Sequence, residues 1–151
     1  MGYFIRFIQT DDEPTTLPML ADALRAVDPL YSIDDIAAVG GDEETGILRY
    51  AGVDYAALEI DRGGELLTDE RQELLDDIAS SRKRRKKDVA AILNGATLFL
   101  VAQVLWADRD TDATLAKFAP LWEWLLTNRH GLVQADGEGY YDSNGKVLAT
   151  E

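Results

Sequence analysis

The sequence predicts an α+β protein, and three patterns support this fold class. Residues 96–106 (ATLFLVAQVLW) form a nearly uncharged apolar run, which is typical of a strand buried on both faces. Residues 17–27 place apolar side chains at helical spacing. Residues 53–61 alternate as a strand does. The run at 96–106 is too short for a membrane span, which requires about 20 apolar residues.

The N-terminal segments predict a strand followed by a helix. Residues 3–8 (YFIRFI) are apolar on both sides except at Arg6, which favours an interior strand. In the helix, Pro18 falls in the first turn, where backbone donors are unpaired, and Asp28-Pro29 ends the helix. The expected apolar stripe comprises Leu17, Leu20, Ala21, Leu24 and Val27.

The next segments contain further strands. Residues 31–39 have a poor pattern, which fits either a strand or an irregular segment, and residues 40–46 (GGDEETG) predict a polar loop. Residues 47–50 and 53–61 predict two strands joined through Ala51-Gly52.

A second helix is predicted after these strands. Thr68 is a favourable N-cap residue, and the acidic residues that follow it suit the first turn of a helix ending near Ser80. Its expected buried stripe comprises Leu67, Leu74, Leu75 and Ile78.

Residues 89–93 have two interpretations. Asn94-Gly95 lies between two apolar runs, which is a hairpin signal and would make this segment a strand. The helical spacing of its apolar residues, together with Ala90 and Ala91, favours a helix capped by Gly95. We favour the helix, and the strand stays the alternative.

The C-terminal third predicts a helix followed by short strands. Residues 108–112 form a capping turn, Pro120 should kink or break the helix, and Gly131 ends it. Two turn signals then separate three short segments, which predicts a β-meander. These segments are residues 132–135, 138–141 and 146–149.

This order of elements matches the β-α-β-β-α-β plan of ferredoxin-like domains, an antiparallel sheet with both helices on one face. We therefore expect one domain over residues 1–151, with a ferredoxin-like core at about 3–106. The C-terminal helix and meander, residues 108–149, should form an extension of that core. The plan hosts many unrelated functions, so it predicts none by itself.

Composition excludes several classes of function. The net charge of −13 repels phosphate backbones and anionic lipids, so we expect neither nucleic acid nor a membrane as a partner. The chain has no cysteine, which excludes disulfides and thiolate chemistry. The N-terminal segment lacks the basic and apolar regions of a signal peptide, so we expect a cytoplasmic protein.

No pattern in the chain predicts an enzyme. His130 is the single histidine, no serine lies in a nucleophile-elbow motif, and a polar residue at a helix end is expected from the helix dipole. One histidine without cysteine cannot form a zinc site. We therefore predict no catalytic residues and no cofactor. Carboxylates that could serve acid–base chemistry are more typical of a solvated surface, and they include Glu59, Asp61, Asp76 and Asp77.

Two acidic segments resemble parts of oxygen-ligand metal sites. Residues 108–112 imitate the start of a calcium loop, but Ala113 stands where that loop requires glycine. The weaker candidates Asp136, Glu138 and Asp142 lie on a hairpin whose turns explain them without a metal. We predict no metal site from either segment.

A basic run is the most unusual stretch of the chain. It contains six of the 15 basic residues and no aromatic residue that could stack on a base. We favour a solvated surface, with a salt-bridge role or an acidic or phosphorylated ligand as the alternatives and nucleic acid as the weakest one. The run consists of Arg82, Lys83, Arg84, Arg85, Lys86 and Lys87.

Two tryptophans provide the best candidate for a partner contact. On a helix Trp122 and Trp124 point about 200° apart, so one core cannot bury both. We assign Trp122 to the buried stripe and place Trp124 with Leu121 on another side, with two alternatives: the meander covers them, or a partner contacts them. The sequence therefore favours a non-catalytic binding or interaction domain, with self-association as one form. The alternative is a carboxylate-based enzyme that uses Mg²⁺ or Ca²⁺.

Overall fold

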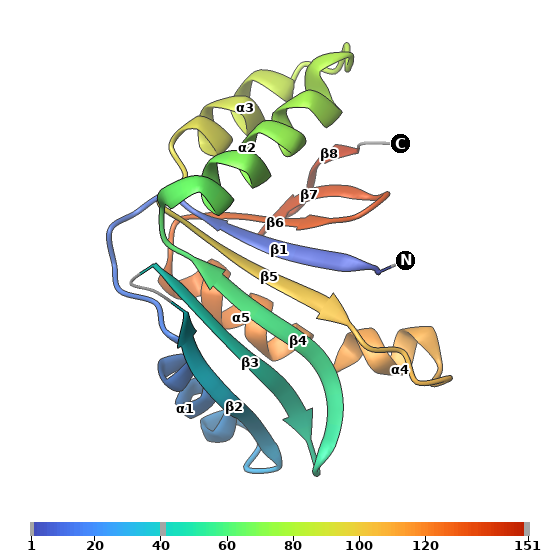
Figure 1. The fold of residues 1–151 in the computed structure, drawn as a ribbon. Helices are drawn as coiled ribbons and strands as arrows, with labels where there is room; N and C mark the ends of the chain where they lie inside the picture. Colours follow the sequence, from blue (N-terminus) through green and yellow to red (C-terminus); the bar gives the residue numbers. More distant parts are fainter. Residues whose placement is uncertain (1, 40–41, 150–151) are drawn as a thin grey trace.

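The computed structural model describes residues 2–39 and 42–149, which form one eight-stranded sheet and five helices (Figure 1). The strands are β1 (Phe4–Gln9), β2 (Tyr31–Val39), β3 (Glu43–Tyr50), β4 (Val53–Asp61), β5 (Leu98–Val104), β6 (Gly131–Ala135), β7 (Gly139–Asp142) and β8 (Gly145–Ala149). The helices are α1 (Leu17–Val27), α2 (Gly64–Ala79), α3 (Lys86–Asn94), α4 (Thr111–Ala116) and α5 (Ala119–Asn128). These elements confirm the α+β class.

The sheet order is β2-β3-β4-β5-β1-β6-β7-β8, and every neighbouring pair is antiparallel. The apolar run predicted as a buried strand is β5, which lies at the centre between β4 and β1. Its side chains are buried or half-buried on both faces, as the uncharged composition requires.

The strand order is not that of a ferredoxin-like domain. In a split βαβ unit the two strands that a helix connects are parallel and another strand lies between them, whereas β4 and β5, which α2 and α3 connect, are adjacent and antiparallel here. The physical reason lies at β1, whose second edge is hydrogen-bonded to β6. The C-terminal meander therefore continues the main sheet and is not an appendage to it. The helices also lie on both faces of the sheet, where the sequence predicted one.

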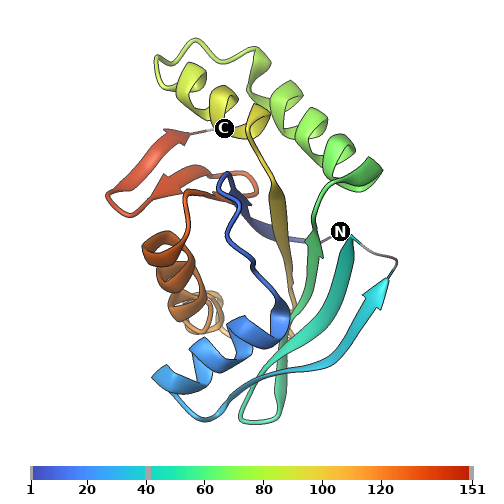
Figure 2. The same ribbon diagram turned by 90° about the vertical axis from the view of Figure 1, so that its left-hand side faces the viewer.

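One face of the sheet is covered by α1 and α5, which lie side by side (Figure 2). The core between them and the sheet uses alternate strand residues such as Phe7, Leu58 and Leu100. Thr16 caps α1 through its hydroxyl, which accepts a hydrogen bond from Met19 N. Four residues of the predicted stripe are buried, but Val27 is 66% exposed because α1 ends there.

The opposite face is covered only in part, by α2 and α3. Their apolar side chains pack on Ile8, Phe99 and Leu132, which belong to the central strands and β6. This second core cluster includes no residue of β2, β3 or β4. Among the described residues, no helix therefore packs into a core against the face of these three strands that points away from α1.

Several local predictions are confirmed and others are wrong. Residues 89–93 belong to a helix, α3, and the expected break at Pro120 separates α4 from α5. Thr68 is not an N-cap, because α2 already begins at Gly64 and the Thr68 hydroxyl donates to the Gly64 carbonyl. The predicted loop at 40–46 is shorter, since β3 begins at Glu43; residues 40 and 41 lie outside the described residues.

No helix in the described part of the chain combines the length and the apolar character that a membrane crossing requires.

Candidate functional sites on the two faces of the sheet

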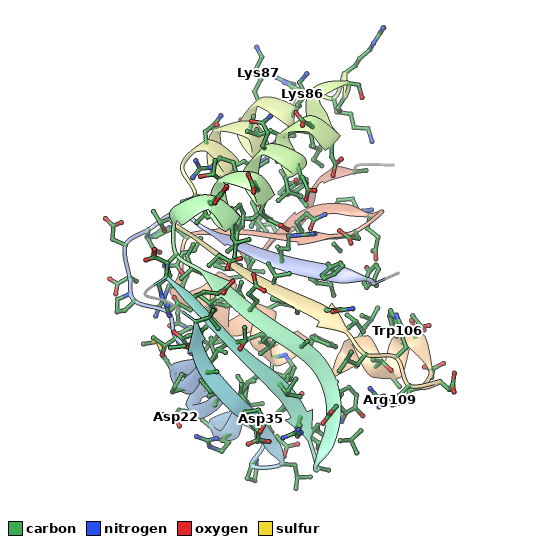
Figure 3. All side chains as sticks on the ribbon, in the orientation of Figure 1. Asp22, Asp35, Lys86, Lys87, Trp106 and Arg109 are labelled. Carbon is green, nitrogen blue, oxygen red and sulfur yellow. The ribbon has the colours of Figure 1, made fainter. Side chains whose placement is uncertain are left out.

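The basic run lies at the tip of the molecule, in the connection from α2 to α3 and the first turn of α3 (Figure 3). Three of its side chains bind other parts of the chain. Lys83 Nζ donates to the Ala149 carbonyl at 3.3 Å, and Lys86 Nζ donates to the Ala79 carbonyl at 3.0 Å. Arg85 Nε lies 2.7 Å from Asp88 Oδ2. These contacts hold the connection between α2 and α3 in place, while Arg82, Arg84 and Lys87 stay exposed.

The predicted contact at Leu121 and Trp124 has a different environment from the one expected. Leu121 is 1% exposed and belongs to the core beneath α5, so its side chain cannot contact a partner in this conformation. Trp124 is half-buried, and the Arg129 guanidinium lies 4.8 Å from the centre of its ring. A partner contact through Trp124 stays a prediction.

The single histidine, His130, holds a loop in place through hydrogen bonds of its backbone. His130 N donates to Asp11 Oδ2 at 2.7 Å, and the His130 carbonyl accepts from Thr10 N at 2.8 Å. Both bonds use the backbone of His130, and they tie the segment after β1 to the start of β6.

The weaker metal candidates bind protein donors instead of facing one another. Asp136 accepts hydrogen bonds from Arg6 and from Phe4 N. Glu138 accepts from the hydroxyls of two tyrosines, and Asp142 accepts from Asn144 N. Within the described residues, these three carboxylates do not form a group of metal-site size.

An apolar groove runs along α5 on the face that carries α1 and α5. We call it the aromatic groove; its volume is about 290 Å³. It exists because α5 is the last of the described helices in the chain, and no described helix covers this face of the sheet beyond β6. It is lined by Tyr3, Ile5, Leu115, Ala119, Trp122, Leu126, Val133, Ala135, Glu138 and Tyr141.

The rim of the aromatic groove is fixed by specific contacts. Trp122 is parallel to Phe118, with ring centroids 6.4 Å apart. Glu138 accepts a hydrogen bond from the Tyr3 hydroxyl at 2.5 Å and one from the Tyr141 hydroxyl at 3.1 Å. Burial and the Glu138 carboxylate raise the pKa of the Tyr3 hydroxyl above its ordinary value. The groove therefore has an aromatic wall supported by these contacts, with one carboxylate at its edge.

A group of three carboxylates lies on the opposite face. We call Glu43, Glu59 and Asp61 the carboxylate cluster; oxygen atoms of all three lie within 4.8 Å of one another. Glu43 stands directly opposite Asp61 in the pairing of β3 with β4, and Glu59 lies two residues before Asp61 on the same face. Cross-strand geometry therefore brings the three side chains together.

A β-bulge is required for this arrangement. Near the β3–β4 turn, Tyr50 pairs with Val53, and the register shifts by one residue between Leu48 and Arg49. Without the shift, Glu43 would oppose Ile60, whose side chain points to the other face. The bulge thus places Glu43 opposite Asp61.

Asp61 is the buried member of the carboxylate cluster. It is 4% exposed, and its Oδ1 atom has no hydrogen-bond partner among the described residues. Burial, followed by hydrogen bonding with Glu59 and repulsion from Glu59, Glu43 and Glu70, raises its pKa to about 8. The raised pKa favours the protonated form of Asp61 at neutral pH.

No basic side chain neutralises the carboxylate cluster within residues 2–39 and 42–149. The nearest candidates are committed elsewhere, since Arg6 forms salt bridges with Glu70 and Asp136. Arg62 likewise binds Glu44. The cluster is therefore an acidic site without a basic partner among the described residues.

Beside the carboxylate cluster the sheet is hollowed into an open depression of about 410 Å³. Its floor and walls include half-buried apolar residues of β1, β3, β4 and β5 together with Thr45 and Gln103. Glu59 lines both the depression and the cluster, so solvent and small solutes can reach the carboxylates from this side.

Sequence reasoning missed both sites, although each left a signal. The alternation in residues 53–61 places Glu59 and Asp61 on one face, but the sequence favoured a solvated surface for them, and Asp61 is buried. Trp122 was assigned to the buried stripe, whereas it is half-buried and lines an open groove.

Comparisons with protein-family models, with curated proteins and with solved structures returned no match for the chain.

Proposed function

We propose that the protein is a non-catalytic interaction domain whose aromatic groove binds a short apolar segment of a partner protein. The observation that carries the proposal is the open, aromatic-lined groove along α5. Tryptophan and tyrosine at a solvent-accessible site are the residues most often found at binding hot spots. Their rings add large apolar contact area at low entropic cost because few torsion angles must be fixed.

The size of the groove favours a short segment of a partner protein as the ligand. A volume of about 290 Å³ is at the lower end of ligand sites, which span about 300–1,000 Å³. A stable interface between folded proteins buries about 800 Å² on each partner, far more than the surface of this groove. One or two bulky apolar side chains projecting from a peptide or helix fit this space.

The negative charge of the chain favours a partner other than a second copy of the same chain. Glu138 is exposed at the rim of the groove, and the chain carries a net charge of −13. Two copies repel each other over distances comparable to the Debye length, about 10 Å at 0.1 M salt. A partner segment with lysine or arginine beside its apolar anchor is attracted by the same field.

The test uses two matched peptides and two matched variants. The peptide KKLWKK contains an apolar anchor, whereas KKGSKK keeps the charge and lacks the anchor. Ala119→Trp fills the groove from an exposed position that lines it. Ala116→Trp adds the same side chain at an exposed position outside the lining. Binding is followed by amide chemical shifts in ¹⁵N-labelled protein.

We expect KKLWKK to shift groove amides and KKGSKK to leave them unchanged. Ala119→Trp should weaken the binding of KKLWKK at least tenfold, and Ala116→Trp should leave it unaltered. Equal binding of both peptides would reduce the effect to charge and overturn the proposal. A dimer in light scattering that Ala119→Trp dissociates would instead identify a second copy as the occupant.

A further inference from the structure

We propose that the carboxylate cluster is a binding site for one divalent cation, with Ca²⁺ as the best fit. The site lies on the face of the sheet opposite the aromatic groove, so this inference is independent of the proposed function. It rests on two observations: three carboxylates converge, and one of them has a buried oxygen without a hydrogen-bond partner in the described part of the chain.

The oxygen separations fit a calcium ion. Ca²⁺ binds oxygen ligands at 2.3–2.6 Å, so two ligands on opposite sides of the ion lie up to about 5 Å apart. The oxygens of Glu43, Glu59 and Asp61 lie within 4.8 Å of one another and satisfy this limit. Mg²⁺ binds at 2.0–2.1 Å in strict octahedral geometry. Ca²⁺ accepts an irregular coordination geometry, which suits carboxylates whose positions are fixed by two strands.

The buried oxygen of Asp61 gives the site an unsatisfied acceptor. A buried carboxylate oxygen without a partner costs free energy, and a partner that enters the site recovers it. Within the described residues no salt bridge reaches any member of the cluster. A cation from solvent can therefore supply the compensation that no side chain provides.

The site has a route of entry and room for further ligands. Glu59 faces the open depression, through which a hydrated ion can approach. Thr45 stands directly opposite Glu59 in the β3–β4 pairing and lines the same depression, so its hydroxyl lies on the same face. Water completes the remaining coordination positions, as it does in most calcium sites on protein surfaces.

Isothermal titration with CaCl₂ at pH 7 measures stoichiometry and affinity on the full chain, and thermal unfolding measures Tm. We expect one ion bound per chain and a rise in Tm of several degrees at saturating Ca²⁺. Asp61→Asn and Glu59→Gln should each weaken binding at least tenfold. Each substitution replaces a carboxyl by an amide of the same shape, so the variants should fold as the original chain does.

The control is Asp112→Asn, which changes an exposed acid in the segment that imitates a calcium loop. It should bind Ca²⁺ as the original chain does. Heats equal to dilution, or binding that Asp61→Asn leaves intact, would overturn the inference. If Asp112→Asn alone lost Ca²⁺ binding, the ion would bind at residues 108–112, and the inference would also be overturned. Binding of Mg²⁺ in preference to Ca²⁺, with the expected variant pattern, would support the site and overturn the choice of ion.

Discussion

The two faces of the sheet differ in how completely helices cover them, although the same strands form both faces. Alternate residues of β4 show the contrast: Leu58 and Ile60 pack beneath α1 and α5, whereas Glu59 and Asp61 point to the half-covered face. The first face carries the apolar aromatic groove, and the second carries carboxylates without a basic partner among the described residues. The comparison teaches that coverage by helices, more than strand composition, decides which residues can serve binding.

The largest expected effect concerns stability. Leu58→Ala removes a fully buried side chain from the covered face and should lower the free energy of unfolding by about 2–5 kcal/mol. Ile47→Ala removes a half-buried side chain from the open depression and should cost under about 1.5 kcal/mol. Urea denaturation measures both, and equal losses would contradict the difference between the faces.

The second prediction concerns pH. Folded Asp61 keeps its proton up to about pH 8, whereas in the unfolded chain it loses the proton near 3.8. The folded state thus binds more protons between these values, so the free energy of unfolding should fall by several kcal/mol as pH rises from 4 to 8, since one pKa unit corresponds to about 1.4 kcal/mol. Asp61→Asn should flatten this dependence and be more stable than the original chain at pH 8. A steeper dependence in the variant would contradict the assignment.

A third prediction concerns the salt bridges beside the cluster. Arg6 binds Glu70 of α2 and Asp136 after β6, and all three groups are at least partly buried. Arg6→Met should destabilise the fold by about 1–3 kcal/mol, because two carboxylates lose their partner. Thermal unfolding with Arg25→Met as the control, which alters an exposed pair on α1, should show the smaller change in the control.

The smallest expected effect is at the basic run. Lys87 makes no hydrogen bond to another described residue, so Lys87→Ala should change Tm by less than about 2 °C. Lys86→Ala loses a bond to the Ala79 carbonyl and should lower Tm more. Replacing the whole run by alanines should leave retention on polyanions unchanged, since the net charge of the rest of the chain is strongly negative. Reduced retention would support nucleic-acid or phosphate binding.

The predictable part of the fold is the part that periodicity encodes. The apolar run at 96–106, the stripe of α1 and the break at Pro120 follow from local pattern and backbone chemistry. Strand order does not, because it depends on which edge of β1 pairs with β6, and no residue pattern within β1 distinguishes its two edges. The ferredoxin-like prediction failed at this point.

The candidate sites depend on the same nonlocal information. Alternation places Glu59 and Asp61 on one face, but the approach of Glu43 depends on a one-residue bulge between Leu48 and Arg49. The nearest glycines, Gly46 and Gly52, lie outside the register shift, so no glycine marks the bulge itself. The aromatic groove depends on where helical cover ends, which the spacing of Trp122 within α5 does not determine.

The most direct test of the central claim is the apparent pKa of the Asp61 carboxyl, followed by ¹³C NMR with and without Ca²⁺. The account predicts an apparent pKa of about 8 in the absence of the ion and a lower value when Ca²⁺ saturates the cluster. An Asp61 carboxyl that titrates near 4 without the ion would show that burial and the neighbouring carboxylates do not raise its pKa, and a pKa that Ca²⁺ leaves unchanged would show that the cluster does not bind the ion.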